Sequence, residues 1–317
     1  MVAPSVRAII TRHPNAEFTF FTSSDGAALF KNFDARITEF LINGKSPFTR
    51  RVKWIYFYFK LRKMDFDLVY CLDSDWRIRS LLERATHRLF KRTVIKYDHV
   101  VHAAIKALQS IGEKTVNVSD ITIPFIPVDE VKIADLNNYL HSKDIKSDDI
   151  LVGLNPSFSG LNRRKTRKYK LWPINKWAQL ADKLHEYGKQ KNKSIKVLIY
   201  TLPKDRQLAS DICSLCEFPP VVLIPEADLE FFKAYLSRLD LFIGPDTGGT
   251  HLAAGLGTNL IALYAITDPF DCGPVVKNIY SSVIRAKIDG DQGNYLDLIS
   301  VEDVFILAKE KLAITAK

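Results

Sequence analysis

The segment 239–264 constrains the fold of this chain more than any other part of the sequence. Two apolar runs, 239–243 and 260–264, predict buried strands. Between them, Asp246-Thr-Gly-Gly-Thr-His251 opens a short apolar helix that we expect to stop at Gly257. Glycines at the helix start leave the first N–H groups and the positive end of the helix dipole open to an anion. The segment therefore predicts a β-loop-α-β unit with a phosphate site.

Apolar runs alternate with helical patterns through the second half of the chain. The strand candidates are Ile150–Leu154, Ile195–Tyr200, Val221–Ile224, Leu239–Ile243 and Leu260–Tyr264. Residues 173–187 place their apolar side chains on one helical face, with Gly188 expected just past the helix end. This alternation predicts a parallel, doubly wound sheet.

The first half repeats the pattern less regularly. Residues 17–22 and 66–72 are typical of strands, and residues 93–97 form a third candidate. Two prolines and a polar run make residues 121–150 the expected connection. The chain opens at residues 2–13 with a helical pattern, although a doubly wound sheet normally begins with a strand.

Length and charge narrow the classes of protein. A chain of 317 residues suits two domains, and we expect them at 1–147 and 148–317, as Rossmann-like units facing a central cleft. The net charge of +9 requires an acidic partner, such as nucleic acid, a phosphorylated sugar or an anionic membrane. No apolar run reaches the ~20 residues of a bilayer span, and no secretory segment follows Met1, so a cytoplasmic location is expected. Cys213 and Cys216 have CxxC spacing, but no second pair or His cluster completes a metal site.

Several motifs together resemble one family. In the second half they are Asp246–Gly257, Leu263–Pro269, Gly273-Pro274, Gly153–Ser159 and Lys170-Leu-Trp-Pro173 with Trp177. In the first half, at lower specificity, they are Pro4–Ile10, Pro14–Glu17, Asp67–Asp73 and the Arg79-Ser80 pair. This set resembles glycosyltransferase family 9, the ADP-heptose:lipopolysaccharide heptosyltransferases and their relatives, over nearly the whole chain.

The resemblance implies a GT-B fold, inversion at the sugar carbon without a metal, and an ADP-sugar held by the C-terminal domain. It also implies a lipid A–core acceptor at the N-terminal domain, near Arg79 and Ser80. The family opens with a strand and a Gly-Asp loop, and that Asp is the proposed general base. We therefore expect the first strand of this domain to be missing and the base to lie upstream of Met1, with Asp73 and Asp75 as weaker substitutes.

The donor ligands are expected around the glycine-rich loop. The amides of Thr247, Gly248 and Gly249 can receive the diphosphate, and His251 can bond a phosphate oxygen. Because two anions repel, Asp246 is expected to bind a sugar hydroxyl or cap the helix. The alternative is that this loop only caps a structural helix.

Further donor residues come from the start of the same domain. Lys170 is expected to neutralise the departing diphosphate, with a solvated surface lysine as the alternative. Asn155, Ser157 and Ser159 can add donors to the phosphates, and Asp205 can take an acidic role near the nucleoside. Phe158 departs from the small residues that the family often carries here.

Residues 48–63 mix basic and aromatic side chains without an acid. Such a segment can lie on an anionic membrane or receive a phosphorylated glycolipid. An ordinary amphipathic helix is the alternative, and no RNA-binding motif accompanies the segment, so no nucleic-acid partner is expected.

The favoured interpretation is a cytoplasmic, membrane-peripheral glycosyltransferase that moves heptose or a related sugar to a lipopolysaccharide acceptor, without a cofactor. Two alternatives stay open. One is a truncated, non-catalytic relative that binds a nucleotide sugar or glycolipid. The other is a GT-B transferase that uses another nucleotide sugar.

Overall fold

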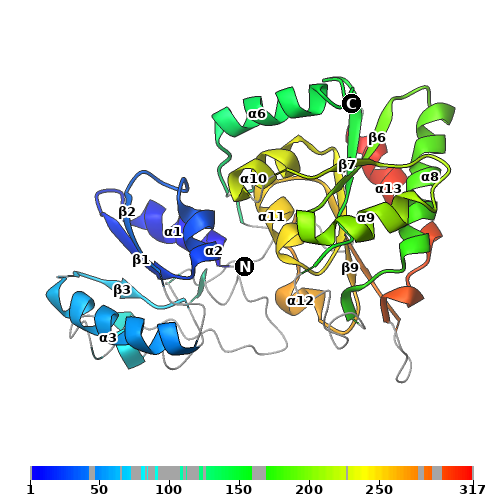
Figure 1. Cartoon of the computed structure of the whole chain (residues 1–317). Helices are drawn as coiled ribbons and strands as arrows, with labels where there is room; N and C mark the ends of the chain where they lie inside the picture. Colours follow the sequence, from blue (N-terminus) through cyan, green and yellow to red (C-terminus); the bar gives the residue numbers. More distant parts are fainter. Residues whose placement is uncertain are drawn as a thin grey trace. The chain divides into compact units, whose positions relative to one another are not determined.

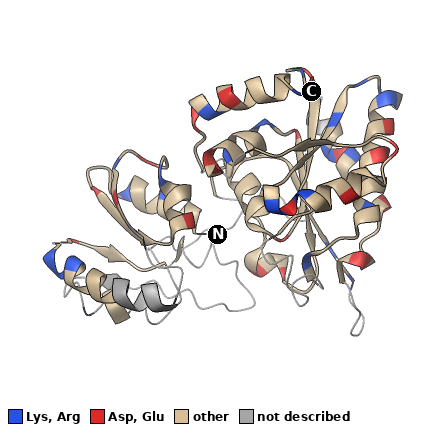
Figure 2. Ribbon diagram, in the orientation of Figure 1, with Lys and Arg blue, Asp and Glu red and all other residues tan. Residues whose placement is uncertain are grey.

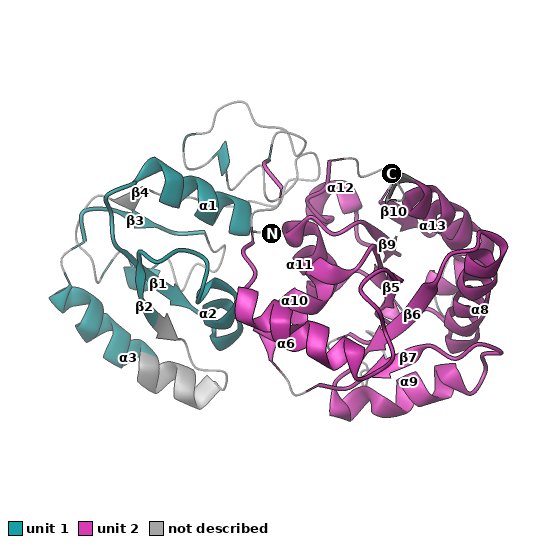
Figure 3. Cartoon of the chain, turned by 90° about the horizontal axis from the view of Figure 1, so that it is seen from above, with its two compact units in different colours: residues 1–121 teal, residues 122–317 magenta. Residues whose placement is uncertain are grey.

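The computed structural model describes residues 2–42, 47–64, 66–72, 80–82, 84, 90–91, 108–109, 112, 121–123, 126–158, 169–225, 228–277, 282–287 and 295–315. The chain divides into two compact units, unit 1 (residues 1–121) and unit 2 (residues 122–317), shown in different colours in Figure 3. Each unit is described by itself.

Unit 1 contains short parallel strand pairs and helices. Its elements are α1 (Ala3–Arg12), β1 (Phe18–Thr22), α2 (Ser24–Phe30), β2 (Ile37–Ile42), α3 (Pro47–Lys63), β3 (Val69–Tyr70) and β4 (Phe90–Lys91) (Figure 1). β1 pairs with β2 and β3 with β4, both in parallel. Parallel neighbours need a crossover, and α2 supplies it between β1 and β2. The expected strands at 17–22 and 66–72 are present as β1 and a shorter β3; the candidate at 93–97 lies outside the described residues.

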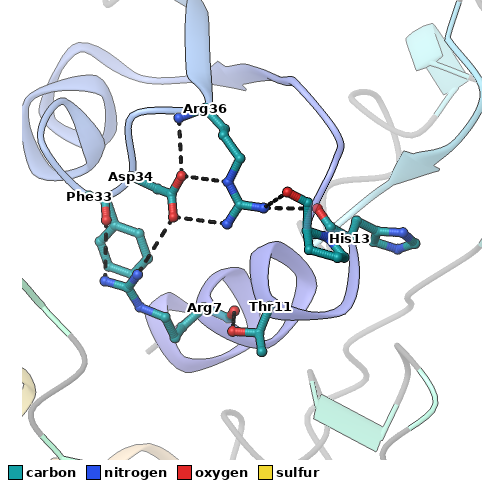
Figure 4. Close-up of polar contacts among 7 residues, drawn as sticks. Arg7, Thr11, His13, Phe33, Asp34 and Arg36 are labelled. Carbon is teal, nitrogen blue, oxygen red and sulfur yellow. Dashed lines mark hydrogen bonds and ion pairs between the residues drawn. The ribbon is translucent and has the colours of Figure 1, made fainter.

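A polar cluster ties the end of α1 to the start of β2 (Figure 4). The Arg36 guanidinium donates to both carboxylate oxygens of Asp34, at 2.9 and 3.1 Å, and to the carbonyl oxygen of His13 at 3.0 Å. These hydrogen bonds from Arg36 lower the pKa of Asp34. Arg7, on α1, donates to the carbonyl oxygen of Phe33 at 3.2 Å and lies over the Phe33 ring. The α1–β1 turn is thus fixed by side chains from the segment before β2.

Unit 2 is a Rossmann-like domain. Its elements are α6 (Glu130–His141), β5 (Ile150–Leu154), α8 (Ile174–Gln190), β6 (Ile195–Tyr200), the 3-10 turn η2 (Pro203–Asp205), α9 (Arg206–Cys213), β7 (Val221–Leu223), α10 (Leu229–Arg238), β8 (Leu241–Pro245), α11 (Gly248–Leu256), β9 (Leu260–Tyr264), α12 (Pro269–Cys272), β10 (Val283–Arg285), the 3-10 turn η3 (Tyr295–Leu298) and α13 (Val301–Thr315).

The six-stranded sheet of unit 2 has the order β10-β9-β8-β5-β6-β7, with every pair parallel. From β5 the chain builds outward through β6 and β7, then returns to the other side of β5 and builds outward through β8, β9 and β10. The strand order therefore reverses between β5 and β8. In open parallel sheets, ligands bind outside the carboxyl ends of the strands at this switch point.

Helices cover both faces of the sheet. α8 packs against α9 and α13, while α10 packs against α11 and α6 (Figures 1 and 3). The core between the sheet and α8 includes Trp172 and Trp177, which are 0% and 1% exposed and meet edge-to-face at 4.9 Å. The predicted doubly wound sheet is thus confirmed for unit 2.

The boundary between the two units falls between residues 121 and 122 of the chain, whereas the sequence placed the domain boundary between 147 and 148. The difference is α6, which lies in the segment interpreted as a connection. Its Leu136 and Leu140 are 0% and 3% exposed, and Tyr139 packs edge-to-face on Phe231 of α10. Lys132 also pairs at 3.0 Å with Asp228, the N-cap of α10. α6 therefore belongs with unit 2, because its apolar face is buried on α10.

In the described part of the chain, no helix has both the length and the apolar character needed to cross a bilayer. None of the four cysteines, all of which lie in the described part of the chain, forms a disulfide; Cys71 is buried, and the other three are half-buried. Burial raises the pKa of Cys216 to about 12, which keeps that thiol protonated and unreactive.

Candidate active site

The loops that follow β5 and β8 meet at the switch point of the unit 2 sheet. The backbone N–H of Asn155, the first residue after β5, donates to the carbonyl oxygen of Ile243 at 2.9 Å. The Asn155 side-chain amide lies 3.5 Å from the hydroxyl of Thr247, the N-cap of α11. Segments 92 positions apart in the sequence are thereby joined at one edge of the sheet.

The N-terminus of α11 is open. Thr247 is the N-cap residue of α11 but makes no side-chain capping bond, which counts against the alternative that this loop only caps a structural helix. A Cβ built on Gly248 would meet nothing within 4 Å, and one on Gly249 would lie 3.5 Å from the Phe232 ring. The helix ends as predicted, with Gly257 in the left-handed conformation at φ 81°. Uncapped amides and the positive end of the helix dipole make this terminus suited to an anion.

Lys170 reaches this helix start from the segment before α8. Its Nζ donates to the backbone carbonyl of Asp246, and it pairs with the Asp246 carboxylate at 3.3 Å. The lysine side chain keeps 31% of its surface exposed, and the aspartate 17%. Trp172 holds the segment in place, because its Nε1 donates to the carbonyl oxygen of Ile299 at 3.1 Å. The two residues that the sequence selected separately thus form one ion pair.

Both oxygens of the Asp246 carboxylate have further partners. The Tyr264 hydroxyl donates to Oδ1 at 3.3 Å, and His251 Nε2 lies 3.5 Å from the same oxygen. The Thr267 hydroxyl donates to Oδ2 at 3.4 Å. Burial opposes ionisation, but the hydrogen bond from His251 and the charge of Lys170 outweigh it, so the pKa of Asp246 is lowered. Asp246 is therefore a fixed, ionised carboxylate.

Tyr264 and Thr267 are site residues that the sequence analysis did not select. Tyr264 ends β9, which pairs with β8, so its side chain lies beside the first residue after β8. Burial raises the pKa of Tyr264, which keeps it a phenol able to donate to Asp246. The signal available in the sequence was a tyrosine at the end of a strand adjacent to the glycine-rich loop.

A second polar pair lies toward the β6 side of the sheet. The Ser157 hydroxyl donates to the Asp205 carboxylate at 2.6 Å, which joins the loop after β5 to η2. Phe158, the departure from small residues, is buried at 6% exposure. Tyr200 at the end of β6 and Phe232 on α10 add aromatic rings 4.7 Å apart at the same edge of the sheet. Polar groups and aromatic rings thus lie at the same edge of the sheet, with Tyr200 and Phe158 buried and Phe232 half-buried.

The remaining predicted residues fall mostly outside the described part. Ser159, Asp73, Asp75 and Arg79 are not described, and Ser80 is a half-buried residue in a short helical turn. Their assigned roles stay predictions. Within the described ranges, no group of three or more His, Cys, Asp or Glu residues could hold a metal ion.

Known proteins match this chain in sequence and in fold. The profile described as glycosyltransferase family 9 (heptosyltransferase) matches residues 60–289, a span that includes the whole of the Asp246 cluster. The chain belongs to glycosyltransferase family 9. This confirms the family to which the sequence motifs pointed.

Curated family 9 relatives are distant in sequence. Lipopolysaccharide heptosyltransferase 3 of Escherichia coli K12 is 26% identical over 261 residues, which cover 77% of this chain and 70% of that protein. Lipopolysaccharide core heptosyltransferase OpsX of Haemophilus influenzae is 32% identical over 105 residues. That match spans 32% of this chain and 28% of the Haemophilus protein.

Solved structures of family 9 proteins share the fold along nearly the whole chain. A family 9 glycosyltransferase from Veillonella parvula superposes with a TM-score of 0.78 at 20% identity, covering 98% of this chain and 92% of that one. The E. coli heptosyltransferase WaaC with ADP gives a TM-score of 0.69 at 18% identity, covering 98% and 95%. This likeness confirms the predicted GT-B fold.

Proposed function

We propose that this protein transfers heptose from an ADP-linked donor to a lipopolysaccharide core acceptor. Family 9 membership and relatives named as lipopolysaccharide heptosyltransferases support this assignment. Structures of WaaC with ADP and with ADP-2-deoxy-2-fluoro heptose point to an ADP-sugar donor. The observation that carries the proposal is the joining of Lys170 and Asp246 at the open N-terminus of α11.

The cluster divides into groups for the phosphates and a group for the sugar. The Gly248 and Gly249 amides and the α11 dipole bind the diphosphate, and Lys170 neutralises its charge. To do so, Lys170 exchanges its present partner, the Asp246 carboxylate, for a phosphate oxygen. Asp246, which would repel the diphosphate, accepts a hydrogen bond from a hydroxyl of the sugar.

Other residues bind the rest of the donor. Asn155 and Ser157 donate to the phosphates or the ribose, and Asp205, which already accepts from Ser157, binds a ribose hydroxyl. His251, in the first turn of α11, is proposed to bond the sugar or a phosphate oxygen.

The reaction is a single displacement. The acceptor hydroxyl oxygen attacks the anomeric carbon while the bond from that carbon to the diphosphate oxygen breaks. ADP leaves with the bonding electron pair, and the hydroxyl proton passes to an aspartate base. Attack from the face opposite ADP inverts the anomeric carbon, and Lys170 with α11 stabilises the charge on the departing ADP without a metal. Asp73 and Asp75 are the base candidates within this sequence.

The acceptor and the location complete the proposal. Arg79 and Ser80, after β3 in unit 1, are proposed to orient a phosphorylated lipid A–core acceptor. Such an acceptor is anchored in lipid, so we propose that the protein works on the cytoplasmic face of the inner membrane.

The test is transfer by the 317-residue protein from ADP-heptose to a defined core acceptor, with EDTA present and absent. We expect transfer in both conditions, and loss of activity with EDTA would contradict the metal-free mechanism. ADP that binds without any transfer would favour a non-catalytic binding protein. Thermal stabilisation by UDP or GDP in place of ADP would favour another donor.

A further inference from the structure

We propose that the outer face of α3 docks unit 1 on an anionic lipid bilayer. This face consists of Ile55, Tyr56, Phe59, Arg62 and Lys63, which lie on one side of the helix by their three- and four-residue spacing. The inference specifies a surface of unit 1 on α3, whereas the donor site is built in unit 2.

The inner face of α3 accounts for its place in the fold. Phe57 and Leu61 are 4% and 2% exposed and pack with Cys71 in a separate apolar cluster of unit 1. Phe57 meets Phe21 of β1 edge-to-face at 5.0 Å, and Lys60 forms an ion pair with Glu39 of β2. These contacts orient the helix without any contribution from its outer face.

The outer face carries large apolar side chains that the core does not use. Ile55, Tyr56 and Phe59 are 64%, 57% and 59% exposed. Single exposed apolar residues are normal on a soluble protein, but three within five positions on one helical face mark an interaction surface. Tyr56 and Phe59 contact the rings of their neighbours in the helix, Phe57 and Tyr58, with centroids 5.5 Å apart. All three exposed side chains keep more than half of their surface exposed, so burial in the core does not account for this patch.

Charge determines the kind of partner. The sequence of α3 contains six basic residues and no acidic one. Arg62 and Lys63 continue the outer face one turn beyond Phe59 and are exposed, and Figure 2 shows Lys and Arg but no acidic residue on the described part of the helix. A second copy of the chain would bring the same basic surface against this one, since a two-fold interface repeats one patch. An anionic partner with an apolar interior fits both parts of the face.

A bilayer with anionic headgroups has these properties. Ile55 and Phe59 would enter the boundary between headgroups and acyl chains, with Tyr56 at headgroup level. Arg62 and Lys63 would extend to the lipid phosphates, where each basic side chain strengthens binding. The helix would lie along the surface, since no described helix is able to span a membrane.

The experiment measures co-sedimentation of the full chain with vesicles of phosphatidylcholine alone or with phosphatidylglycerol. We expect binding to the vesicles that contain phosphatidylglycerol, weakened by salt. Ile55→Ser with Phe59→Ser should weaken it at least about tenfold, because two apolar side chains no longer insert. Arg62→Gln with Lys63→Gln should weaken it about 30-fold, since two cations near the surface are removed.

Matched controls lie in unit 2. Val131→Ser with Ile306→Ser removes apolar side chains that are 66% and 45% exposed on α6 and α13, and Lys143→Gln with Lys146→Gln removes two exposed cations. Neither control should change vesicle binding. The near-UV circular dichroism of the α3 variants should match that of the wild type, which shows that unit 1 with its aromatic cluster is folded, and their ADP affinity should be unchanged because the donor site lies in unit 2. If the protein transfers heptose but does not bind vesicles, the docking role of α3 is refuted and the proposed transferase function is not.

Three results would overturn the proposal. One is equal binding to neutral and anionic vesicles, or unchanged binding in both α3 variants. A second is self-association of the wild type that Ile55→Ser with Phe59→Ser abolishes. The third is binding only to a water-soluble anionic core oligosaccharide, lost in Arg62→Gln with Lys63→Gln but indifferent to the apolar substitutions.

Discussion

Replacing Lys170 by alanine is the most direct test of the donor site. In the structure its Nζ interacts with the backbone carbonyl and the carboxylate of Asp246, with 31% of the side chain exposed. The proposed role requires that Nζ turn from this carboxylate to the diphosphate. A hydrogen bond between charged groups contributes ~1.5–3 kcal/mol, so Lys170→Ala should raise the Kd for ADP about 10- to 150-fold. Because the lysine gives up one anion to bind another, we expect the lower part of that range.

The measurement is calorimetric titration with ADP at fixed ionic strength. Lys183→Ala is the matched control, since Lys183 also forms an ion pair, with Glu302 at 3.0 Å, but lies 42% exposed on α8. The Kd of Lys183→Ala for ADP should equal that of the wild type. Unchanged ADP affinity in Lys170→Ala, or an equal loss in the control, would remove Lys170 from the diphosphate site.

If Lys170 leaves the Asp246 carboxylate to bind the diphosphate, a substitution at Asp246 should have the opposite effect on ADP affinity. Asp246→Asn frees Lys170 from a carboxylate and removes an anion close to the diphosphate, so ADP alone should bind more tightly. ADP-heptose should lose part of that gain, because the sugar hydroxyl loses its charged acceptor. Weaker binding of ADP by Asp246→Asn would refute the exchange.

Three further predictions concern stability. Trp172→Phe should destabilise the fold by about 1–3 kcal/mol, since it removes the hydrogen bond to Ile299 and buried ring volume; urea denaturation measures this, and an unchanged midpoint would contradict the anchoring role. The pKa of Asp246 is lowered, so its ionisation stabilises the fold fully above the unfolded value near ~3.9 and ceases to do so as the pH falls through the lower folded value. The stability difference between wild type and Asp246→Asn should therefore shrink only below about pH 4, and a difference that already shrinks near pH 6 would refute this. Lys233, 0% exposed, pairs with Glu230 at 2.8 Å, so Lys233→Ala should cost about 3–5 kcal/mol by leaving a buried carboxylate unpaired, while Lys233→Met with Glu230→Gln should recover most of that loss.

Local pattern predicted the strands of unit 2 well. Ile150–Leu154, Ile195–Tyr200 and Leu260–Tyr264 have the expected bounds, because each is a mainly apolar run, with Lys196 as the one charged exception, that is largely buried in a parallel sheet. The same reasoning was wrong at Gly188, expected to end the helix that continues to Gln190. A Cβ on Gly188 would lie 2.9 Å from the Lys193 carbonyl oxygen. This glycine, inside the last turn of α8, therefore allows the chain that follows the helix to pack closely against it.

Site residues could be predicted where they belong to a sequence motif. They could not be predicted where their role depends on a contact between segments that are distant in the sequence. Lys170, Asp246 and Thr247 were found from the sequence of their own segments. The ion pair between Lys170 and Asp246, and the contribution of Tyr264, depend on which strands are neighbours in the sheet. That neighbourhood is decided by tertiary packing, so no local pattern contains it. α6 was missed for the same reason, because its apolar residues acquire a partner only when α10 is in place.

The bond from Trp172 to the carbonyl of Ile299 has a consequence for synthesis of the protein. The segment that carries Lys170 is made early in unit 2, yet its anchor is added 127 positions later. A nascent chain that has already produced the glycine-rich loop would still lack a fixed lysine. Competence to bind nucleotide should therefore arise only after Ile299 has been added and has left the ribosome. A chain cut before Ile299 would keep every donor ligand and bind ADP poorly.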